Sequence, residues 1–366
     1  MGCATTNNAT RQMETKNLRP LPPSYELNAL SEFPSTEDGY QLGVSACYAG
    51  IIGNTLIMAG GCNFPEPGRK RYYQGIYAAD ITTPHLEWQL IGRLPEPAAY
   101  GVSVGSADSL VFAGGNNNDH SLSTVTSIHL VDGKAVVRQL PSLPFTADNF
   151  AGALTADSLF VFGGNQDGIP SSSLWHYDIH SGRCTHVGNA PGKPRVQPVC
   201  AAVEGKVYLW GGFFADGESS VVHTDGYCFN PHEGTWNQLP SASALNHKPS
   251  SLTLSGGTCA VVGTDIICLG GVNKDIFLDA ISGRYQFVAK EDYLKKDPSW
   301  YRFNPHLMSF DTRSGRFHEL TPSSSRLARA GAAIVAVPST TLLYYIGGET
   351  KPSVRTNIIE QITLNR

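Results

Sequence analysis

One segment near the end of the chain combines a carboxylate and an arginine at a spacing suited to acid/base chemistry. It reads Gly348-Glu349-Thr350-Lys351-Pro352-Ser353-Val354-Arg355. Nearby cations favour an ionised carboxylate, whereas burial raises its pKa, and the sequence does not decide which effect is larger. Arg355 could instead bind a substrate carboxylate through two parallel hydrogen bonds. We take Glu349 and Arg355 as candidate catalytic residues and Lys351 as a candidate for substrate binding, the alternative being an ordinary surface loop.

The segment follows the last of six copies of a short repeat, an apolar run that ends in two glycines. The copies span residues 55–61, 109–115, 158–164, 206–212, 265–271 and 342–348. Such runs are typical of strands buried on both faces, and paired glycines allow a sharp bend and close packing against a neighbouring sheet. The copies show signs of four strands each, apart from the last copy, and they recur at a spacing of about 50 residues, which predicts the blades of an all-β propeller.

The last copy lacks a fourth strand, and the N-terminus supplies a candidate for it at residues 25–30. We therefore predict a six-bladed propeller whose N- and C-terminal strands share one blade, which leaves no sheet edge open. The propeller domain would span residues 18–366, after a disordered tail at residues 1–17. Two long loops, 63–75 and 273–304, are rich in aromatic and charged residues, and we expect them to act as lids or, alternatively, as protein-docking insertions.

The residues that follow the glycine pairs should meet at one mouth of the propeller channel. These pairs are Cys62-Asn63, Asn116-Asn117, Asn165-Gln166, Phe213-Phe214, Val272-Asn273 and Glu349-Thr350. Amides both donate and accept hydrogen bonds, so amides beside aromatic rings suit a hydroxylated ligand such as a sugar. Asparagine also tolerates the turn geometry after glycine without any ligand. For the set as a whole we favour ligand binding, and we include Asn165 and Asn273 among the candidate substrate-binding residues.

The composition narrows the range of partners. The 366-residue chain has a net charge of -4 and 16% charged residues, so it has no basic field for nucleic acid or an anionic membrane. It contains no apolar run of about 18 residues that would span a membrane. Its eight cysteines include no C-x-x-C pair, which argues against a zinc or redox motif, and we expect neither a metal nor another cofactor. Residues 1–8 are similar to the remainder of a lipoprotein signal with a lipid anchor at Cys3, or they are a tail with an incidental cysteine.

The repeat resembles the kelch repeat, and three segments resemble the N-acetylneuraminate epimerase family of sialic acid mutarotases. Residues 348–356 are similar to that family's Gly-Glu-x-Lys-Pro-x-x-Arg-Thr loop, residues 270–277 to the start of its long insertion, and residues 194–197 to a motif before a buried strand. The first similarity implies that Glu349 is the proton acceptor and Arg355 its essential neighbour. Because the segments occur in a different order along this chain, it resembles a cyclically permuted member.

The resemblance implies an isomerase that interconverts the α and β anomers of N-acetylneuraminate, or of a related keto acid sugar, by acid/base ring opening. Arg355 with Arg195 or Lys274 would hold the substrate carboxylate, and the asparagines at the channel mouth would hold hydroxyl and N-acetyl groups. Gln197 is a further candidate substrate-binding residue. It also implies a periplasmic or lipid-anchored protein, or a cytoplasmic one if no upstream signal exists. The oligomeric state stays open.

Three other functions remain alternatives at this point. A non-catalytic kelch module could bind a carbohydrate or a protein, since the fold alone does not give activity. A sialidase-like hydrolase also has six blades, but the repeated Asp-box turn of sialidases is missing from this sequence. A copper radical oxidase on a kelch propeller would explain Tyr227-Cys228, yet no pair of histidines follows the glycine pairs.

Overall fold

The computed structural model describes residues 23–365 apart from 31, 106–107, 156–157 and 246–250. The predicted tail at residues 1–17, including Cys3, lies outside this part of the chain. The described residues form an all-β protein with six main antiparallel sheets, each a path of four strands. This arrangement is consistent with a β-propeller.

Each of the six sheets begins with an inner strand and ends with an outer one. In that order, they are β2 (Tyr48–Ile52), β3 (Thr55–Ala59), β6 (Gly75–Asp80) and β7 (Gln89–Arg93); β8 (Val102–Gly105), β9 (Leu110–Ala113), β10 (Val125–Val131) and β11 (Lys134–Leu140); β13 (Ala151–Thr155), β14 (Ser158–Phe162), β17 (Ser173–Asp178) and β18 (Cys184–Asn189); β19 (Val196–Val203), β20 (Lys206–Ala215), β22 (Gly226–Asn230) and β23 (Thr235–Leu239); β24 (Gly257–Val262), β25 (Asp265–Gly270), β26 (Leu307–Asp311) and β27 (Arg316–Leu320); and β28 (Ala333–Ala336), β29 (Leu342–Ile346), β32 (Ile359–Asn365) and β1 (Ser24–Leu30).

Shorter elements lie in the connections between these strands. The short strands are β4 (Cys62–Glu66), β5 (Arg69–Tyr72), β12 (Ala147–Asp148), β15 (Asn165–Gln166), β16 (Ile169–Pro170), β21 (Ser220–Val222), β30 (Glu349–Lys351) and β31 (Val354–Arg355). The helices are α1 (Lys274–Ile281), α2 (Lys290–Tyr293), and the 3₁₀ turns η1 (Tyr40–Leu42), η2 (Ala242–Ala244), η3 (Pro298–Tyr301) and η4 (Ser325–Leu327). No helix in the described residues is both long and apolar enough to cross a membrane.

The two ends of the described chain meet in one sheet. Strand β1 pairs antiparallel with β32 over its whole length, from Ser24 opposite Asn365 to Leu30 opposite Ile359. β1 therefore supplies the outer strand that the last repeat lacks, as the sequence predicted. The N-terminal strand also covers the edge of β32 that would otherwise be open to pairing.

The inner strands of the six sheets contact one another in a closed cycle: β28, β2, β8, β13, β19, β24 and back to β28. Near the start of each inner strand lies one residue whose backbone N–H donates to the carbonyl of its counterpart in the neighbouring sheet. We call these six residues the inner ring, and their bonds of 2.7 to 3.0 Å close on themselves: Ala46 to Gly331, Tyr100 to Ala46, Asn149 to Tyr100, Gln197 to Asn149, Gly256 to Gln197 and Gly331 to Gly256.

The glycine pairs of the repeat set the spacing between neighbouring sheets. In all six pairs the first glycine has a positive φ, and a Cβ added to it would lie 2.3 to 2.7 Å from backbone atoms of the next sheet. At Gly347, in the last sheet, the obstructing atom is the carbonyl oxygen of Val44, which precedes the first inner strand. Any side chain at these positions would force two sheets apart, which explains why every copy of the repeat has the glycine.

Apolar residues fill the spaces between neighbouring sheets. One cluster joins Leu56 and Met58 of β3 to Tyr344 and Ile346 of β29, so the first and last repeats share a core. All four side chains are at most 1% exposed. Burial of each such side chain stabilises the fold by about 1.5–3 kcal/mol, which makes the closure of the ring part of the hydrophobic core.

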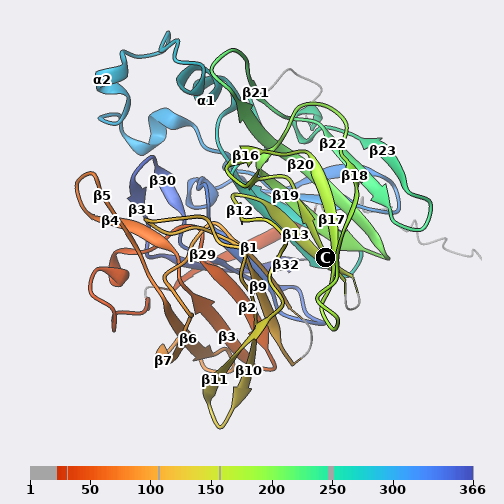
Figure 1. The fold of residues 1–366 in the computed structure, drawn as a ribbon. Helices are drawn as coiled ribbons and strands as arrows, with labels where there is room; N and C mark the ends of the chain where they lie inside the picture. Colours follow the sequence, from red (N-terminus) through yellow and green to blue (C-terminus); the bar gives the residue numbers. More distant parts are fainter. Residues whose placement is uncertain (1–22, 31, 106–107, 156–157, 246–250, 366) are drawn as a thin grey trace, which may run out of the picture.

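The long connection at residues 273–304 folds into α1, α2 and η3. Figure 1 shows α1 and α2 at the same end of the molecule as the hairpins β4–β5 and β30–β31. Asn273 caps α1, since its side-chain oxygen accepts from the backbone N–H groups of Asp275 and Ile276, at 3.1 Å each. η3 contacts β30, and β4 contacts β31. These contacts bring the two hairpins and the helical segment together at one mouth of the ring.

Candidate active site

The hairpin of β30 and β31 places Glu349 and Arg355 opposite each other. The two residues are direct cross-strand partners, so their side chains project from the same face. The turn between them contains Pro352, and Ser353 has a φ of 67°. Proline followed by a residue of positive φ is typical of a type II turn. The hairpin geometry therefore produces the ion pair, in which Arg355 Nη2 lies 2.8 Å from Glu349 Oε1.

Contacts from another part of the chain hold the Arg355 side chain, which is 3% exposed. Its Nε donates to Ser45 Oγ at 3.0 Å, and its guanidinium lies 4.9 Å from the centre of the Phe64 ring, as in a cation–π contact. Its remaining nitrogen, Nη1, is buried and has no hydrogen-bond partner among the described residues. A buried N–H without a partner is costly, so Nη1 is an unsatisfied donor beside the ion pair.

Glu349 lies in an environment that favours its uncharged form more than water does. Its side chain is 22% exposed, and burial raises its pKa above the ordinary carboxyl value. The positive charges of Arg355 and Lys70 act in the opposite direction, but they do not outweigh burial. A carboxylate with a raised pKa is a better proton acceptor than an ordinary one, which suits a general base.

Glu349 lines a cavity of about 200 Å³ that we call the site cavity. Its floor includes Tyr100, Gln197 and Gly331 of the inner ring. Its roof comes from the segment 273–304, whose lining side chains are Ile276, Phe277, Tyr293, Tyr301 and Phe303. The Tyr301 hydroxyl donates to the carbonyl of Tyr293, which fixes one aromatic ring against the other. A mostly apolar cavity with a few polar groups is typical of a small-molecule site.

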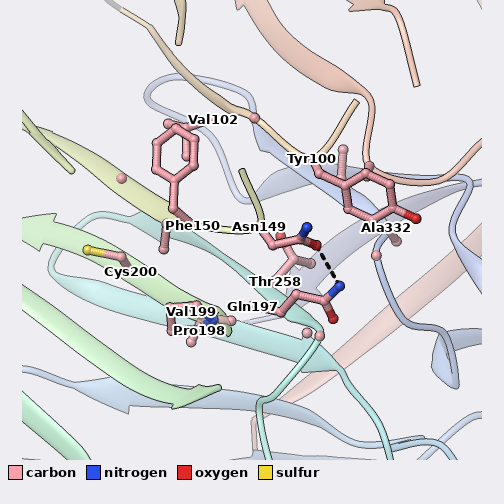
Figure 2. A pocket seen from close by; sticks show the side chains of 18 of the residues that line it. Tyr100, Val102, Asn149, Phe150, Gln197, Pro198, Val199, Cys200, Thr258 and Ala332 are labelled. Atoms are coloured by element: carbon pink, nitrogen blue, oxygen red, sulfur yellow. Dashed lines mark hydrogen bonds between the residues drawn. The ribbon is translucent and has the colours of Figure 1, made fainter. Parts of the chain in front are cut away.

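A second cavity of about 200 Å³, the channel cavity, lies among the inner strands and shares Tyr100, Gln197 and Gly331 with the site cavity. Figure 2 shows the amides of Asn149 and Gln197 meeting in it, where Gln197 Nε2 donates to Asn149 Oδ1 at 2.8 Å. The inner ring is asymmetric, since Ala46, Gly256 and Gly331 have only a methyl group or no side chain. Polar side chains from the ring therefore reach the cavities from one side only.

The structure brings several residues predicted from the sequence to the site cavity. Gln197 and Asn273 line it together with Glu349, although the Asn273 oxygen is engaged in capping α1. Lys351 has a different contact, since its Nζ donates to the carbonyls of Leu294 and Lys296 at 3.2 and 2.7 Å. Lys351 thus fastens the segment 273–304 to the hairpin that carries the Glu349–Arg355 pair.

Three other predicted residues are engaged elsewhere, and the structure does not bring them together with Glu349. The fully buried Arg195 donates to the Gly211 carbonyl at 2.8 Å and to Asp225 Oδ1 at 2.9 Å. Lys274 pairs with Asp275 at 3.4 Å. Asn165 donates to Asp148 Oδ1 at 2.8 Å. Arg195 therefore holds a glycine pair in place within its own sheet, which differs from the carboxylate clamp that we expected.

The sequence did not identify a second group of residues around the ion pair. Lys70 donates to the Tyr72 hydroxyl at 2.8 Å, and its Nζ lies 4.4 Å from the centre of the Tyr100 ring. Ser45 and the buried Cys62 complete the surroundings of Arg355. The segment 63–75 was recognised as an insertion, but nothing local in it indicates which side chain faces a hairpin almost 300 positions away. In the described residues, no three His, Cys, Asp or Glu side chains are grouped so that they could hold a metal ion.

Comparison with known proteins gives consistent matches to one family. The family model described as N-acetylneuraminate epimerase matches residues 140–366. The N-acetylneuraminate epimerase of Haemophilus influenzae (strain PittEE) is 34% identical over 236 residues, which are 59% of this chain and 57% of that protein. The protein of the same name from Yersinia pestis (strain Pestoides F) is 29% identical over 245 residues, 61% and 57% of the two chains. The match thus spans just over half the length of these curated relatives.

A solved structure supports the fold. The chain described as "Structure of YjhT" is 23% identical, with a TM-score of 0.52, over 62% of this chain and 66% of that chain. At this level of identity the likeness concerns the kelch-type β fold and not the chemistry of the site.

Proposed function

This chain belongs to the N-acetylneuraminate epimerase family, and from that premise we propose that it interconverts the α and β anomers of N-acetylneuraminate or of a related keto acid sugar. The relatives carry this activity in their name, and the match covers 57% of their length. The observation that carries the proposal for this chain is the Glu349–Arg355 pair at 2.8 Å, with Glu349 in the wall of a covered cavity.

The chemistry needs a base and an acid on the sugar ring. Glu349, as a carboxylate, would accept the proton of the anomeric hydroxyl while another group protonates the ring oxygen. The bond between the anomeric carbon and the ring oxygen then breaks to give the open keto form, and closure on the other face gives the opposite anomer. The raised pKa of Glu349 makes it a suitable proton acceptor in the first step.

Arg355 would have two tasks in this reaction. Its Nη2 orients Glu349 through the ion pair, and its unpaired Nη1 can donate to the carboxylate of a sugar acid. Arg355 and Lys70 carry two positive charges and Glu349 carries one negative charge. The site is therefore suited to an anion with one negative charge. The predicted roles of Gln197 and Asn273 in holding polar substituents are compatible with their places in the cavity wall.

We further propose that the six sheets are kelch blades of a six-bladed propeller and that the chain is a cyclically permuted family member. Three observations support this: the family model matches only residues 140–366, the match covers 57% of the relatives, and the sheets before residue 140 complete the cycle of inner-strand contacts. A variant with Asn365 joined to Ser24 by a short linker and reopened in the connection 141–146 should fold and keep its activity. Failure of this variant to fold would contradict the permutation.

The location of the protein is also a proposal. The similarity of residues 1–8 to a lipoprotein signal supports a periplasmic or lipid-anchored protein attached at Cys3, a residue outside the described part of the chain. Replacement of Cys3 by alanine should then release the protein from the membrane fraction of cells. An unchanged distribution would remove the anchor from the proposal.

The activity is tested by a proton NMR time course with α-N-acetylneuraminate released by a sialidase at the start of the experiment. Wild-type protein should speed the approach to the anomeric equilibrium above the spontaneous rate, and Glu349→Gln should not. If wild type gives no acceleration, the proposed function fails, and a binding module becomes the better interpretation. If wild type and Glu349→Gln accelerate equally, the activity stands but Glu349 is not its base.

A further inference from the structure

We propose that Lys70 is the acid of this site, the group that protonates the ring oxygen of the sugar while Glu349 deprotonates the anomeric hydroxyl. This inference rests on the function proposed above and assigns its missing proton donor. Lys70 is on strand β5 of the hairpin β4–β5, and this hairpin lies outside the segment matched by the family model.

The hairpin β4–β5 occupies the place in the first repeat that β30–β31 occupies in the last. Cys62 follows one glycine pair and faces Tyr72 across its hairpin, just as Glu349 follows another pair and faces Arg355. The two repeats are neighbours because Gly348 donates to the Val44 carbonyl. Strand β4 contacts β31, and Phe64 of β4 lies against the Arg355 guanidinium. Closure of the ring thus sets the two hairpins side by side.

Strand geometry aims Lys70 and Tyr72 in the same direction, since residues two apart in a strand share a face. Lys70 Nζ donates to the Tyr72 hydroxyl at 2.8 Å and lies 4.7 and 4.4 Å from the ring centres of Tyr72 and Tyr100. Among the described residues, no carboxylate lies within salt-bridge distance of this ammonium. The aromatic rings hold the cation without neutralising it, which leaves its protons available for donation.

The position of Lys70 relative to the cavity fits an acid. Tyr100, over whose ring the ammonium lies, lines the site cavity together with Glu349. Lys70 and Glu349 are close enough for each charge to affect the pKa of the other. An acid and a base that lie near one cavity can act on two oxygens attached to the same carbon, as the anomeric hydroxyl and the ring oxygen are.

The surrounding groups leave Lys70 suited to giving up a proton. Burial lowers its pKa from the ordinary lysine value, and the charge of Arg355 acts in the same direction, whereas Cys62 and Glu349 act against it. Tyr72 and Tyr100 also face the ammonium, and burial raises the pKa of both phenols, so they remain neutral. A lysine with a lowered pKa transfers its proton more readily at neutral pH than an exposed lysine does.

The step balances in atoms and charge. The Glu349 carboxylate takes the proton of the anomeric hydroxyl, and the carbonyl group forms as the bond to the ring oxygen breaks. The electron pair of that bond goes to the ring oxygen, which takes a proton from the Lys70 ammonium. The site then holds a neutral carboxylic acid, a neutral amine and the open keto acid. Reclosure on the other face returns both protons, so nothing is consumed.

The test compares Lys70→Met, Lys70→Arg and wild type in the NMR assay. A general acid contributes about 10²–10⁴-fold, so kcat should fall by that factor in Lys70→Met, with a much smaller change in KM. Lys70→Arg should show a similar loss of kcat, because a guanidinium keeps the charge but does not release its proton. Arg69→Met is the matched control, since Arg69 is an exposed neighbour on the same strand and pairs only with Glu66 at 3.3 Å.

Two further measurements distinguish an acid from a structural lysine. The kcat of wild type should decline at alkaline pH as Lys70 loses its proton, and this decline should be absent in Lys70→Met. Added methylammonium should restore part of the kcat of Lys70→Met. If Lys70→Arg keeps the wild-type kcat while Lys70→Met only raises KM, Lys70 binds the substrate carboxylate and the inference is wrong. If wild type itself gives no acceleration, the proposed function fails first, which is a separate result.

Discussion

Two glutamates of the last repeat, eleven positions apart, illustrate the difference between a carboxylate that stabilises the fold and one that is available for chemistry. Glu360 on β32 is fully buried, and both its oxygens accept from arginines: Arg326 binds each oxygen, and Arg329 Nη2 binds Oε1 at 3.3 Å. Glu349 on β30 has a single arginine partner and lines a cavity. Both oxygens of Glu360 are occupied by arginines, whereas Glu349 can still accept a hydrogen bond from a ligand in the cavity.

The arginines of the two pairs differ in the same way. Arg329 donates to the carbonyls of Gly347 and Ile358, at 3.1 and 2.8 Å, in addition to Glu360. Arg195 repeats this arrangement two sheets earlier with Gly211 and Asp225. Arg355 instead binds two side chains and keeps one buried N–H free. Arg329 and Arg195 bind the backbone at a glycine pair and so stabilise the fold of their repeat. Arg355 binds side chains and can take part in a functional site.

The largest expected effect is a difference in the free energy of unfolding between variants of Glu360 and Glu349. Glu360→Gln leaves the buried Arg329 without its counter-ion, which should lower the free energy of unfolding by about 3–5 kcal/mol. Glu349→Gln should cost less, because Glu349 is 22% exposed and its folded environment favours the uncharged form more than water does. Urea denaturation of both variants measures the difference. Equal losses of stability would mean that Glu349 is a structural residue like Glu360.

The next effect is a difference between Arg355 and Arg329, one of which should affect kinetics and the other stability. Arg355→Lys keeps a positive charge but loses the fork that binds Glu349 and Ser45 together, and a hydrogen bond to a charged group contributes about 1.5–3 kcal/mol. We expect kcat/KM to fall by about 10–100-fold, with little change in stability. Arg329→Lys should show the reverse pattern, a loss of stability with nearly normal kinetics. Normal kinetics in Arg355→Lys would show that charge alone suffices beside Glu349.

The division between what the sequence predicts and what it leaves out follows from these contacts. The glycine pairs, the terminal strand at residues 25–30 and the pair Glu349–Arg355 are local patterns, because a repeat unit and a two-residue turn determine their geometry. Lys70 and Ser45 reach the site only through packing of the last repeat against the first, and Tyr100 joins them from the second sheet, so no local spacing indicates these residues.

The expected role of Arg195 in holding the substrate carboxylate was based on the resemblance and not on the repeat. The sequence offered a corrective signal, since Arg195 and Arg329 each lie two positions before an inner-ring residue, Gln197 and Gly331. Arginines at equivalent places in two repeats indicate a role in the repeat itself. The pKa of Glu349 was also beyond the sequence, because the balance between burial and nearby cations depends on the roof that residues 273–304 form.

The third prediction concerns pH. Glu349 must be ionised to act as a base, and its pKa in the folded protein is raised, so kcat should rise with pH through a value above the ordinary carboxyl range. The free energy of unfolding should depend on pH in the opposite direction to kcat. Between the unfolded and the folded pKa the folded state binds more protons, so the free energy of unfolding of wild type should fall with rising pH relative to Glu349→Gln. A free energy of unfolding of wild type that rises with pH relative to Glu349→Gln would instead indicate a lowered pKa.

The smallest expected effect concerns the contact between the roof and the hairpin. Lys351 binds the carbonyls of Leu294 and Lys296, and its removal should let the segment 290–296 open more often without touching the Glu349–Arg355 pair. Two hydrogen bonds of this kind contribute about 1 kcal/mol each, so Lys351→Met should raise KM by about 3–10-fold with kcat nearly unchanged. Hydrogen exchange should become faster in 290–296.

The matched control for this variant is Lys295→Met, which removes an exposed lysine of the same segment that pairs only with Asp292 at 3.0 Å. That change should leave both KM and hydrogen exchange as in wild type. If Lys351→Met lowers kcat as strongly as Arg355→Lys does, Lys351 acts on the substrate, as the sequence first suggested. A pure KM effect would instead identify Lys351 as the residue that holds the roof closed, and the chemistry would then belong to Glu349 and the cations that surround it.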